Sequence, residues 1–281
     1  MRWCLLLVCV GCVDAELVPQ EGTFSVITYN VQGLPDALTD SPRPTLDRMQ
    51  DIAPLLDDYD VVGLQEDFDP DWHDALVAGA SHEDAYWTDE TLDDRVYSAG
   101  LAVLSRLSQQ PSATVYREFY YSSCHGTLDG SGDCLASKGF QVATVRLADN
   151  EWVDIVNTHH EAGGGEQDIA ARAIQVEEVI AALDESHAVV FMGDTNLHID
   201  DVEDVAALSR YADAGLQDVC VLLDCPENDH IDRIFVRSSP TLTLDALSWQ
   251  RPPHFVGDDG EPLSDHPPIS AEISWAASAE R

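Results

Sequence analysis

The stretch AVVFMGDTN, residues 188–196, decides how the rest of the chain is interpreted. Its first five residues are all apolar, which is typical of a strand buried on both faces. Gly193 permits a sharp backbone turn directly after that strand, so an acid, Asp194, and a carboxamide, Asn196, follow it closely. In α/β folds, ligand-binding side chains collect at the carboxyl ends of strands. A single motif of this kind is more often a plain turn than a site, so its meaning depends on the other strands.

Composition and charge limit the architecture and the partners of the chain. Its 281 residues are near the upper size for one hydrophobic core, and 44% of them are apolar. No repeat or linker divides the sequence, so we expect one domain over residues 22–276. The net charge of −38 repels polyanions, and the few Lys and Arg residues argue against tight binding to a nucleic-acid backbone. An acidic surface adapted to salt or solubility explains the charge equally well.

The first fifteen residues are expected to be a leader and not part of the fold. A basic start at Arg2 precedes the apolar residues 3–10, a stretch too short to span a bilayer. Two endings are compatible with the sequence: signal-peptide cleavage after Ala15, or a lipobox-like ending in which Cys12 carries lipid. Either ending predicts an exported protein, secreted or lipid-anchored at the cell envelope. No later segment has the length and apolar character of a transmembrane helix.

The cysteines agree with export. Three of the seven lie in the leader, and the other four form two pairs that each bracket a short polar loop. Neither pair has the spacing of a zinc site. In an oxidising compartment we expect the bridges Cys124–Cys134 and Cys220–Cys225. Free thiols are the alternative, because sequence alone does not fix connectivity.

Apolar periodicity predicts strands alternating with a few helices. Strands are expected over residues 24–29, 61–66, 100–106, 114–121, 138–145, 152–158, 188–192, 231–236 and 269–275. Helices are expected over residues 45–57, with a kink at Pro54, over 166–184 and over 202–211. The second helix is expected to bury Ile169, Ala173, Val176, Ile180 and Leu183.

Residues 67–91 are acidic and aromatic, with Trp72, His73, His82 and Trp87 among them. Exposed rings that touch lipid and rings that pack at the edge of the core are both possible. Packing is favoured, because amphipathic rings are ordinary residues at a core edge. The two histidines lack the spacing of metal ligands and are given no role.

Polar side chains recur at the ends of the predicted strands. They are Asn30, Glu66, His159, Asp194, Asn196, Asp232, Asp265 and His266. The set contains hard oxygen donors and imidazoles but no thiolate, and such oxygens suit Mg²⁺. Two histidines can supply the proton transfers that phosphodiester cleavage needs besides the metal. Any one of these residues alone is more often structural, so the prediction depends on their convergence.

Seven short motifs occur in a fixed order along the chain. They are TYNVQG (28–33), LQE (64–66), GLAVLSR (100–106), NTH (157–159), GDTN (193–196), IDRIF (231–235) and LSDH (263–266). The set resembles the endonuclease/exonuclease/phosphatase superfamily, which includes secreted DNase I-like nucleases, abasic-site endonucleases, neutral sphingomyelinases and inositol-polyphosphate phosphatases. The match runs from Phe24 to Trp275. The resemblance implies an α/β fold: a four-layer α/β/β/α sandwich of two mostly antiparallel sheets, packed face to face, with outer helices.

The resemblance also implies roles for the metal ligands and the base. Glu66 and Asn30 would bind Mg²⁺, or Mn²⁺ or Ca²⁺ in its place, with Asp265 as a further direct or water-mediated contact. His266 would be the general base towards water, and Asp232 would orient its ring. The structural alternatives are that Asp232 pairs with a neighbouring arginine and that Asp265 only shapes the following Pro-Pro turn.

The remaining roles concern the phosphate. By resemblance, Asp194 would align the nucleophile, Asn196 would donate to the phosphate, and His159 would stabilise the developing charge or assist the leaving oxygen. His160 should point the opposite way from His159, into packing. Lys138 is either a surface charge or part of a stretch shared with sphingomyelinase-like members, and Arg172 and Gln175 are expected to tie the start of their helix to a loop.

Three functions remain open. A sphingomyelinase-like phosphodiesterase is favoured by the segment containing both cysteines and KGF (124–140), by export and by the lack of a basic face. A secreted DNase I-like endonuclease is supported by IDRIF, but a nuclease groove offers arginines to phosphates, and the candidates here are few: Arg43, Arg95, Arg106 and Arg233. Salt or Mg²⁺ can weaken that objection. A non-catalytic binding protein would be expected to lack some of these intact residues.

We therefore expect a phosphodiester substrate in which a lipid head group is favoured over nucleic acid. Peripheral membrane contact and a monomeric state are expected as well.

Overall fold

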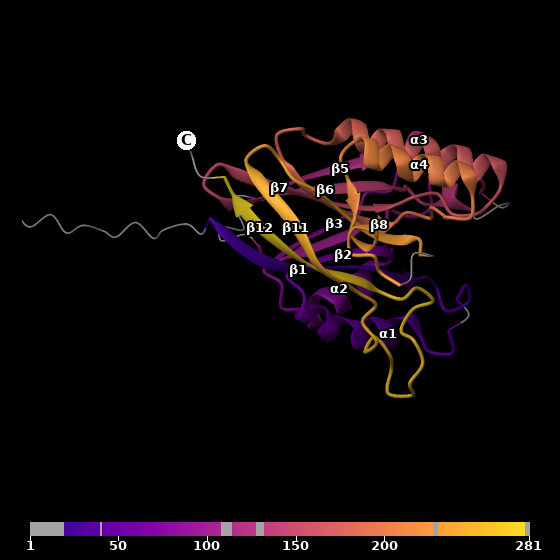
Figure 1. Ribbon diagram of the computed structural model, residues 1–281. Helices are drawn as coiled ribbons and strands as arrows, with labels where there is room; N and C mark the ends of the chain where they lie inside the picture. Colours follow the sequence, from indigo (N-terminus) through magenta and orange to yellow (C-terminus); the bar gives the residue numbers. More distant parts are fainter. Residues whose placement is uncertain (1–19, 40, 108–113, 128–131, 227–229, 279–281) are drawn as a thin grey trace, which may run out of the picture.

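The computed structural model describes residues 20–39, 41–107, 114–127, 132–226 and 230–278 (Figure 1). The predicted leader, with both of its possible endings, lies outside the described residues. No helix in the described part of the chain combines the length and the hydropathy needed to cross a membrane.

Two six-stranded sheets form the centre of the molecule. The first has the order β11-β12-β1-β2-β4-β3, with β1 (Glu21–Gly33), β2 (Val61–Asp67), β3 (Asp84–Trp87), β4 (Ala102–Ser105), β11 (Leu242–Gln250) and β12 (Ile269–Ala277). The second has the order β5-β6-β7-β8-β10-β9, with β5 (Val115–Tyr120), β6 (Gly139–Ala148), β7 (Glu151–His159), β8 (Ala188–Asp194), β9 (Gln217–Asp218) and β10 (Asp232–Arg237). Among the described strands, β1–β2 and β7–β8 pair in parallel and all other neighbours are antiparallel.

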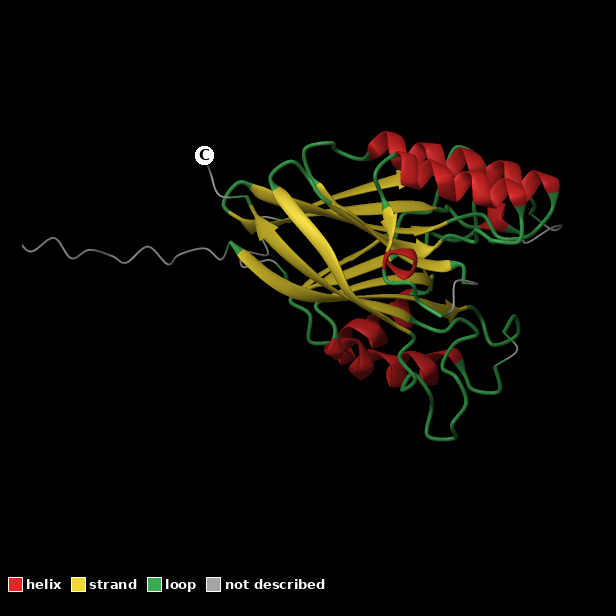
Figure 2. Cartoon of the chain, in the orientation of Figure 1, coloured by secondary structure: helices red, strands yellow, loops and turns green. Residues whose placement is uncertain are grey.

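Helices cover the outer face of each sheet (Figure 2). The first sheet is covered by α1 (Thr45–Ile52), the 3₁₀ helix η1 (Ala53–Asp58) and α2 (Pro70–Gly79), and the second by α3 (Glu166–Ala182) and α4 (Val202–Asp213). The short helices are η3 (Asp133–Leu135) and α5 (Val219–Leu222). The predicted break at Pro54 is confirmed, because α1 ends two residues before it and the chain continues as η1. The predicted four-layer α/β/β/α sandwich is also confirmed.

Three apolar layers hold the sheets and helices together. One fills the space between the sheets and includes Val26, Val103 and Val190. A second lies between the first sheet and its helices and includes Ile27. Successive side chains of a strand point to opposite faces, so the neighbours Val26 and Ile27 enter different layers. The third lies under α3 and α4 and includes Phe191. Strands buried on both faces explain why their sequences are almost continuously apolar.

The buried face of α3 agrees with the predicted one except at Ala173. Val176 is buried, and Ile180 and Leu183 pack against the same core cluster. Ala173 is exposed, whereas the polar residues Arg172 and Gln175 are buried. These two polar side chains are buried because they satisfy backbone groups of loops: Arg172 Nη1 donates to the carbonyl of Gly163 at 2.6 Å, and Gln175 Nε2 donates to that of Ser123 at 2.9 Å. Their predicted tie to a loop is therefore confirmed, and it places two polar side chains on the buried side that apolar spacing does not indicate.

A buried amide connects the two sheets. Asn157 of β7 donates through Nδ2 to the carbonyls of Leu64 (2.9 Å) and Ala102 (3.0 Å), and its Oδ1 accepts from Gln65 Nε2 at 2.7 Å. Gly63 leaves room for this contact, because a Cβ there would lie 2.9 Å from Asn157 Oδ1. Asn157 lies two residues before His159 and Gln65 directly precedes Glu66. The amide therefore fixes the position of one predicted site residue relative to another across the interface between the sheets.

We expect Asn157→Ala to lower the free energy of unfolding by at least about 2 kcal/mol, because two buried carbonyls and the Gln65 amide lose their partner. Urea unfolding followed by circular dichroism measures this change. Gln167→Ala, which truncates an exposed amide in the first turn of α3, is the control and should stay within about 0.5 kcal/mol of the wild type. Equal stability of the two variants would contradict the role of the inter-sheet amide.

Candidate active site

Carboxylates from both sheets meet at the side-chain amide of Asn30. Its Nδ2 donates to Glu66 Oε1 at 3.0 Å and to Asp194 Oδ2 at 3.1 Å. Its Oδ1 accepts from the backbone N–H of Gln32 at 3.0 Å, which settles the orientation of the amide. The strands that carry Asn30 and Glu66 belong to the first sheet and the strand that carries Asp194 belongs to the second. Asn30 therefore tethers two acids that no single sheet could bring together.

The backbone is bent sharply where these strands end. Gln32, Glu66 and Asn196 have φ values of 51°, 58° and 49°, in the left-handed region that costs a non-glycine residue roughly 1–3 kcal/mol. Gly193 has φ 146°, and a Cβ there would lie 2.1 Å from the carbonyl oxygen of Thr158. The turn predicted at Gly193 is wrong, because β8 continues through it to Asp194; the glycine is needed instead for its positive φ and its close approach to Thr158. Residues with left-handed backbone nevertheless concentrate at the edge where the predicted site residues lie.

His266 and Asp232 form a close pair in the same cluster. His266 Nδ1 lies 2.9 Å from Asp232 Oδ2 and 3.8 Å from Asp194 Oδ2. Asp232 is not the partner of its neighbour Arg233, which turns to Asp218 with an Nη1–Oδ2 distance of 2.8 Å. Among the described residues, the other oxygen of Asp232 is buried without a hydrogen-bond partner. Asp194, Asp232 and His266 can bring one ligand atom each to within 4.8 Å of one another, a spacing compatible with a metal ion.

The pKa values in this cluster show an excess of negative charge. Burial alone would lower the pKa of His266, but the hydrogen bond and charge of Asp232, together with the charges of Asp194 and Asp265, raise it to about 10. Burial, and then the charge of Asp194, raise the pKa of Asp232 to about 6. Burial also raises the pKa of Glu66, and Asp194 adds to that shift. Positive charge therefore compensates the acids only in part.

His159 ends β7 beside a buried lysine. Its Nε2 lies 3.1 Å from Lys138 Nζ and 3.5 Å from Asp194 Oδ2. Lys138 also donates to the carbonyl of His160 at 2.8 Å and forms an ion pair with Asp133. Because an ammonium can only donate, His159 Nε2 accepts, and we assign the ring proton to Nδ1. Burial and the charge of Lys138 lower the pKa of His159 well below its usual value, so the ring is neutral.

Of the residues found at the site, Lys138 is the one whose role the sequence indicated least clearly. Its side chain is buried, which rules out the alternative of a surface charge. The sequence assigned it no catalytic or binding role, although it directly precedes the strand that runs beside β7. An isolated lysine in a sequence is usually exposed, so its contact with His159 could be found only from the fold.

The remaining predicted residues lie around this cluster. Asn196 is buried; its backbone N–H donates to Asp194 Oδ1 at 3.1 Å and its Nδ2 to the carbonyl of His160 at 3.3 Å. His160 packs away from the acids, as predicted, with Nε2 2.7 Å from the hydroxyl of Tyr211. Asp265 is exposed, and its Oδ1 accepts from the Ser264 hydroxyl at 3.3 Å. The structure therefore brings seven of the eight predicted residues together and leaves Asp265 at the solvent-exposed rim.

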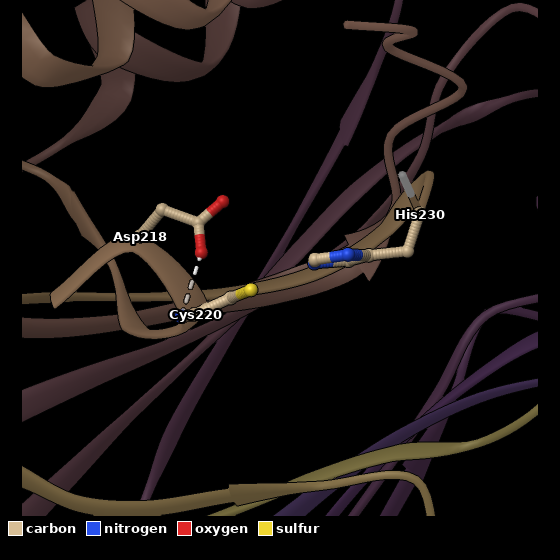
Figure 3. Close-up of side chains that lie close together, drawn as sticks. All are labelled: Asp218, Cys220 and His230. Atoms are coloured by element: carbon tan, nitrogen blue, oxygen red, sulfur yellow. Dashed lines mark hydrogen bonds between the residues drawn. The ribbon is translucent and has the colours of Figure 1, made fainter. Parts of the chain in front are cut away.

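A second group of potential metal ligands does not form a metal site. Asp218, Cys220 and His230 lie close together (Figure 3). The sulfur of Cys220 is bonded to Cys225, as predicted, so it is not a free thiolate. Asp218 instead caps α5, where its Oδ1 accepts from the backbone N–H of Cys220 at 2.9 Å.

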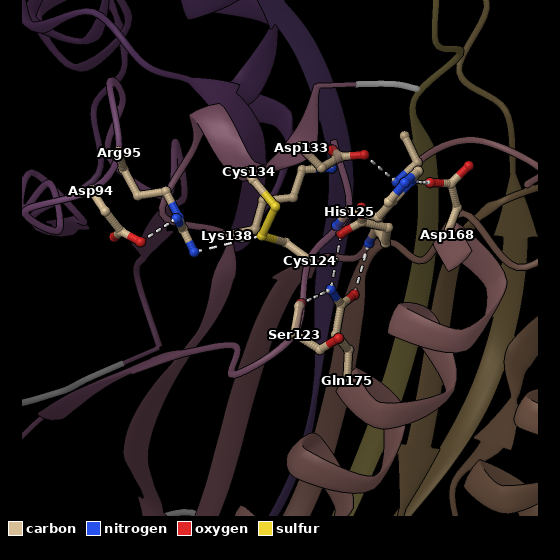
Figure 4. Close-up of a disulfide and its surroundings, with 12 residues drawn as sticks. Asp94, Arg95, Ser123, Cys124, His125, Asp133, Cys134, Lys138, Asp168 and Gln175 are labelled. Carbon is tan, nitrogen blue, oxygen red and sulfur yellow. Dashed lines mark hydrogen bonds and ion pairs between the residues drawn. A yellow bond between two sulfur atoms is a disulfide. The ribbon is translucent and has the colours of Figure 1, made fainter. Parts of the chain in front are cut away.

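The second predicted disulfide, Cys124–Cys134, is also confirmed and lies beside the segment that follows His159 (Figure 4). Residues next to each of its cysteines hold that segment. The backbone N–H of His125 donates to Glu161 Oε1 at 2.7 Å, and Asp133 Oδ2 accepts from the N–H of Ala162 at 2.9 Å. Asp133 also pairs with Lys138, so the bridged loop supports the side of the site that carries His159.

The arginines considered for phosphate binding are all engaged with acids. Their ion pairs are Arg43–Asp51, Arg95–Asp94, Arg106–Asp57 and Arg233–Asp218. None of these four guanidinium groups is left with an uncompensated charge for a polyanion.

Comparison with known proteins identifies the family. The sequence profile of the Endonuclease/Exonuclease/phosphatase family matches residues 27–266. The chain belongs to this family. It is 31% identical over 275 residues to sphingomyelinases of Mycobacterium tuberculosis and Mycobacterium bovis, in an alignment that covers 91% of this chain and 54% of the relative. The chain thus spans about half the length of these curated relatives.

Solved structures of other proteins share the fold. Beta toxin from Staphylococcus aureus, in a mutant form with bound magnesium ions, is 18% identical with a TM-score of 0.65, covering 92% of this chain and 100% of the toxin chain. D. rerio TDP2 complexed with single strand DNA product is 21% identical with a TM-score of 0.67, covering 89% and 98%. At these identities the likeness concerns the fold alone. One neighbour is a toxin and the other has DNA bound, so the fold does not select a substrate.

We expect His266 to retain its proton at pH 8 in the protein without divalent cations, because Asp232 and Asp194 raise its pKa to about 10. Asp232→Asn should lower this pKa by at least about one unit, since it removes the nearest negative charge. Imidazole nitrogen chemical shifts from NMR, recorded across a pH series in EDTA, measure both values. His187 is a control ring, because it lies just before β8, at the end of that strand opposite Asp194. A normal pKa for His266 in the wild type would contradict the pairing.

Proposed function

We propose that this chain is a metal-dependent phosphodiesterase of the sphingomyelinase type, which hydrolyses a lipid phosphodiester by in-line attack of water. One observation carries the proposal. Asp194 Oδ2 lies 3.5 Å from His159 Nε2 and 3.8 Å from His266 Nδ1, while Asn30 links the same oxygen to Glu66. Two imidazoles thus share one carboxylate, and a cation bound to the acids would lower the high pKa of His266 towards the range that a general base needs.

The donor set fits a hard divalent cation such as Mg²⁺. Three carboxylates meet with little positive charge, one Asp232 oxygen has no hydrogen-bond partner among the described residues, and the pKa of Glu66 is raised. Glu66 and Asp194 would hold the ion, and Asp265 would reach it through water from the rim. Asn30 would contribute its oxygen only if its amide turned away from Gln32. When bound, the ion would stabilise negative charge on the phosphate and make a coordinated water more acidic.

His266 is the proposed general base. Its Nδ1 is occupied by Asp232, so Nε2 is the nitrogen that remains to take a proton from water. The neutral ring carries its proton on Nδ1, which donates a hydrogen bond to Asp232. The same carboxylate stabilises the imidazolium that forms after the ring takes a proton from water. Asp194 would align the water, since it lies between the two histidines.

Lys138 and His159 are proposed to stabilise the phosphate. The buried ammonium of Lys138 lies against the neutral ring of His159. A positive charge and an imidazole are therefore already in place where negative charge would develop on the phosphate. Asn196, held against Asp194 by its own backbone, would present its amide to a phosphate oxygen. The Lys138 ammonium would donate the proton that the leaving oxygen takes up, because the neutral ring of His159 accepts at Nε2.

Charge and exposed apolar residues favour a lipid surface over nucleic acid. The net charge is −38, and the four candidate arginines are paired with acids. After Asp194 the chain exposes Ile199, Val202 and Val205, and Val202 is 74% exposed. Ile199 and Val205 line one groove together with Val221 and Leu222. This apolar patch, which follows the end of β8, is proposed to contact the membrane peripherally. Both disulfides suit the exported location proposed here.

The purified protein should hydrolyse sphingomyelin in vesicles when Mg²⁺ is present and lose this activity in EDTA, because the acid cluster then lacks its cation. Plasmid DNA and bis(p-nitrophenyl) phosphate, assayed in parallel with and without EDTA, complete the comparison. Lipid turnover without plasmid nicking supports the proposal. Nicking without lipid turnover would establish the nuclease alternative, and inactivity on all three substrates would indicate a binding protein.

His266→Gln and His159→Gln should each lower kcat for sphingomyelin by about 10²–10⁴-fold, the usual contribution of a proton-transfer group. His187→Gln is the matched control, since His187 is half-buried but lies at the opposite end of β8, and it should keep wild-type activity. Circular dichroism would show that all three variants are folded. Full activity of a folded His266→Gln protein would exclude this residue as the base.

A further inference from the structure

A fully buried arginine, Arg48 of α1, contacts two segments of the chain that carry site residues. In the described part of the chain, all the hydrogen-bond partners of its guanidinium group are neutral oxygens. Its Nε is buried without a partner there. Burying a cation without a counterion is costly, and apolar packing alone does not require it. The mechanism proposed above does not use this residue.

The guanidinium group joins the turn after Asn30 to the loop before His266. Its Nη1 donates to the carbonyl of Leu263 at 2.8 Å and to that of Val31 at 3.1 Å, and its Nη2 donates to the carbonyl of Gln32 at 2.8 Å. Val31 and Gln32 directly follow Asn30, and Leu263 lies three residues before His266. One side chain therefore fixes the position of the tethering amide relative to that of the proposed base.

Ser264 supplies a second link between the same two segments. Its hydroxyl donates to the carbonyl of Asn30 at 2.7 Å, a shorter contact than the one to Asp265, and accepts from the backbone N–H of His266 at 3.2 Å. The turn itself contains Gln32 in left-handed backbone, whose N–H donates to Asn30 Oδ1. Such a turn persists only where its surroundings hold it in place.

We propose that Arg48 is a positioning residue for the proposed reaction, which holds the loop of His266 against the turn of Asn30 and so keeps the base at a fixed distance from the carboxylate cluster. The inference rests on the proposed function, because Arg48 would act through His266. A guanidinium group suits this task. Its planar fork meets carbonyls of both segments in fixed directions, whereas the ammonium of a lysine is a point charge on a flexible stem.

A role in stability alone explains these contacts less well. An apolar side chain would attach α1 to the sheet without burying a charge, as Met49 and Ile52 of the same helix do. A residue needed only for stability would also have no reason to select the two segments that carry Asn30 and His266. The cost of the buried charge is therefore better explained by the fixed geometry that it imposes on the site.

Turnover by Arg48→Lys tests the role, because this change keeps the positive charge and removes the fork. We expect kcat for sphingomyelin to fall by about 10²-fold, the loss that a shift of about 1 Å at the reacting groups can cause, while KM changes by less than about twofold. Arg237→Lys is the matched control and should keep wild-type kinetics. Arg237 also donates to a loop carbonyl, that of Asp184 at 2.6 Å, but it lies at the end of β10 opposite Asp232.

NMR tests the same role without turnover. In the wild type, His266 Nδ1 lies 2.9 Å from Asp232 Oδ2. Imidazole nitrogen chemical shifts, recorded at a single pH in EDTA, should show the His266 ring of Arg48→Lys moving towards the values of a solvent-exposed ring. The shifts of His187, at the opposite end of β8, should not change, and Arg237→Lys should leave the His266 ring as it is in the wild type.

Thr45→Val is the second variant, for use if Arg48→Lys does not fold. It removes the hydroxyl that accepts from Arg48 Nη2 at 3.2 Å and leaves the arginine itself in place. The same pattern of lower kcat and altered His266 shifts is expected, at smaller size.

Unchanged His266 shifts in a folded Arg48→Lys protein would overturn the inference, whatever the activity. A wild type that hydrolyses no phosphodiester, but whose His266 shifts respond to Arg48→Lys, would retain the positioning contact and overturn the proposed hydrolysis.

Discussion

The side-chain amide of Asn30 joins carboxylates that belong to different sheets, and the geometry of the site depends on it. Glu66 and Asp194 carry like charges, and burial raises the pKa of Glu66. One neutral amide compensates only part of the cost of holding two acids in this place, so the cluster needs further positive or hydrogen-bonding groups. The same requirement explains why both imidazoles and Lys138 gather around it. The negative charge of the acids thus accounts for the basic side chains that are buried around them.

The fold supports this cluster by fixing the two sheets relative to each other. Apolar packing alone is non-directional, so the layer between the sheets could tolerate small shifts in their alignment. The amide of Asn157 removes that freedom, because it must meet the carbonyls of Leu64 and Ala102 and the side chain of Gln65 together. Left-handed backbone at Glu66 then turns the chain at the point where the acid must leave the strand. Strain concentrated here is consistent with a site whose geometry is imposed by its surroundings.

Sequence reasoning succeeded where local chemistry determines structure. Apolar runs that end in polar residues, as at Asp194, predicted strand ends that do converge, and Pro54 predicted a helix break. It failed where a residue is defined by a distant partner. Arg172 is buried against Asp204 of α4, and Lys138 donates to the carbonyl of His160, just after the far end of the neighbouring strand β7; periodicity carries no information about such partners. The edge strand β11 was missed because its alternating, half-exposed residues give a weaker signal than a buried run.

The net charge of the chain and the positive group at the site act at different ranges. Lys138, whose ammonium lies 3.1 Å from His159 Nε2, is a positive group beside the carboxylate cluster, where the phosphate is proposed to bind. A polyanion would have to approach a protein of net charge −38 before it reached this group, and the four candidate arginines are paired with acids. A neutral zwitterionic lipid surface carries no such penalty. The acidity of the chain therefore disfavours nucleic acid at long range and leaves the binding of the proposed phosphate group to short-range contacts.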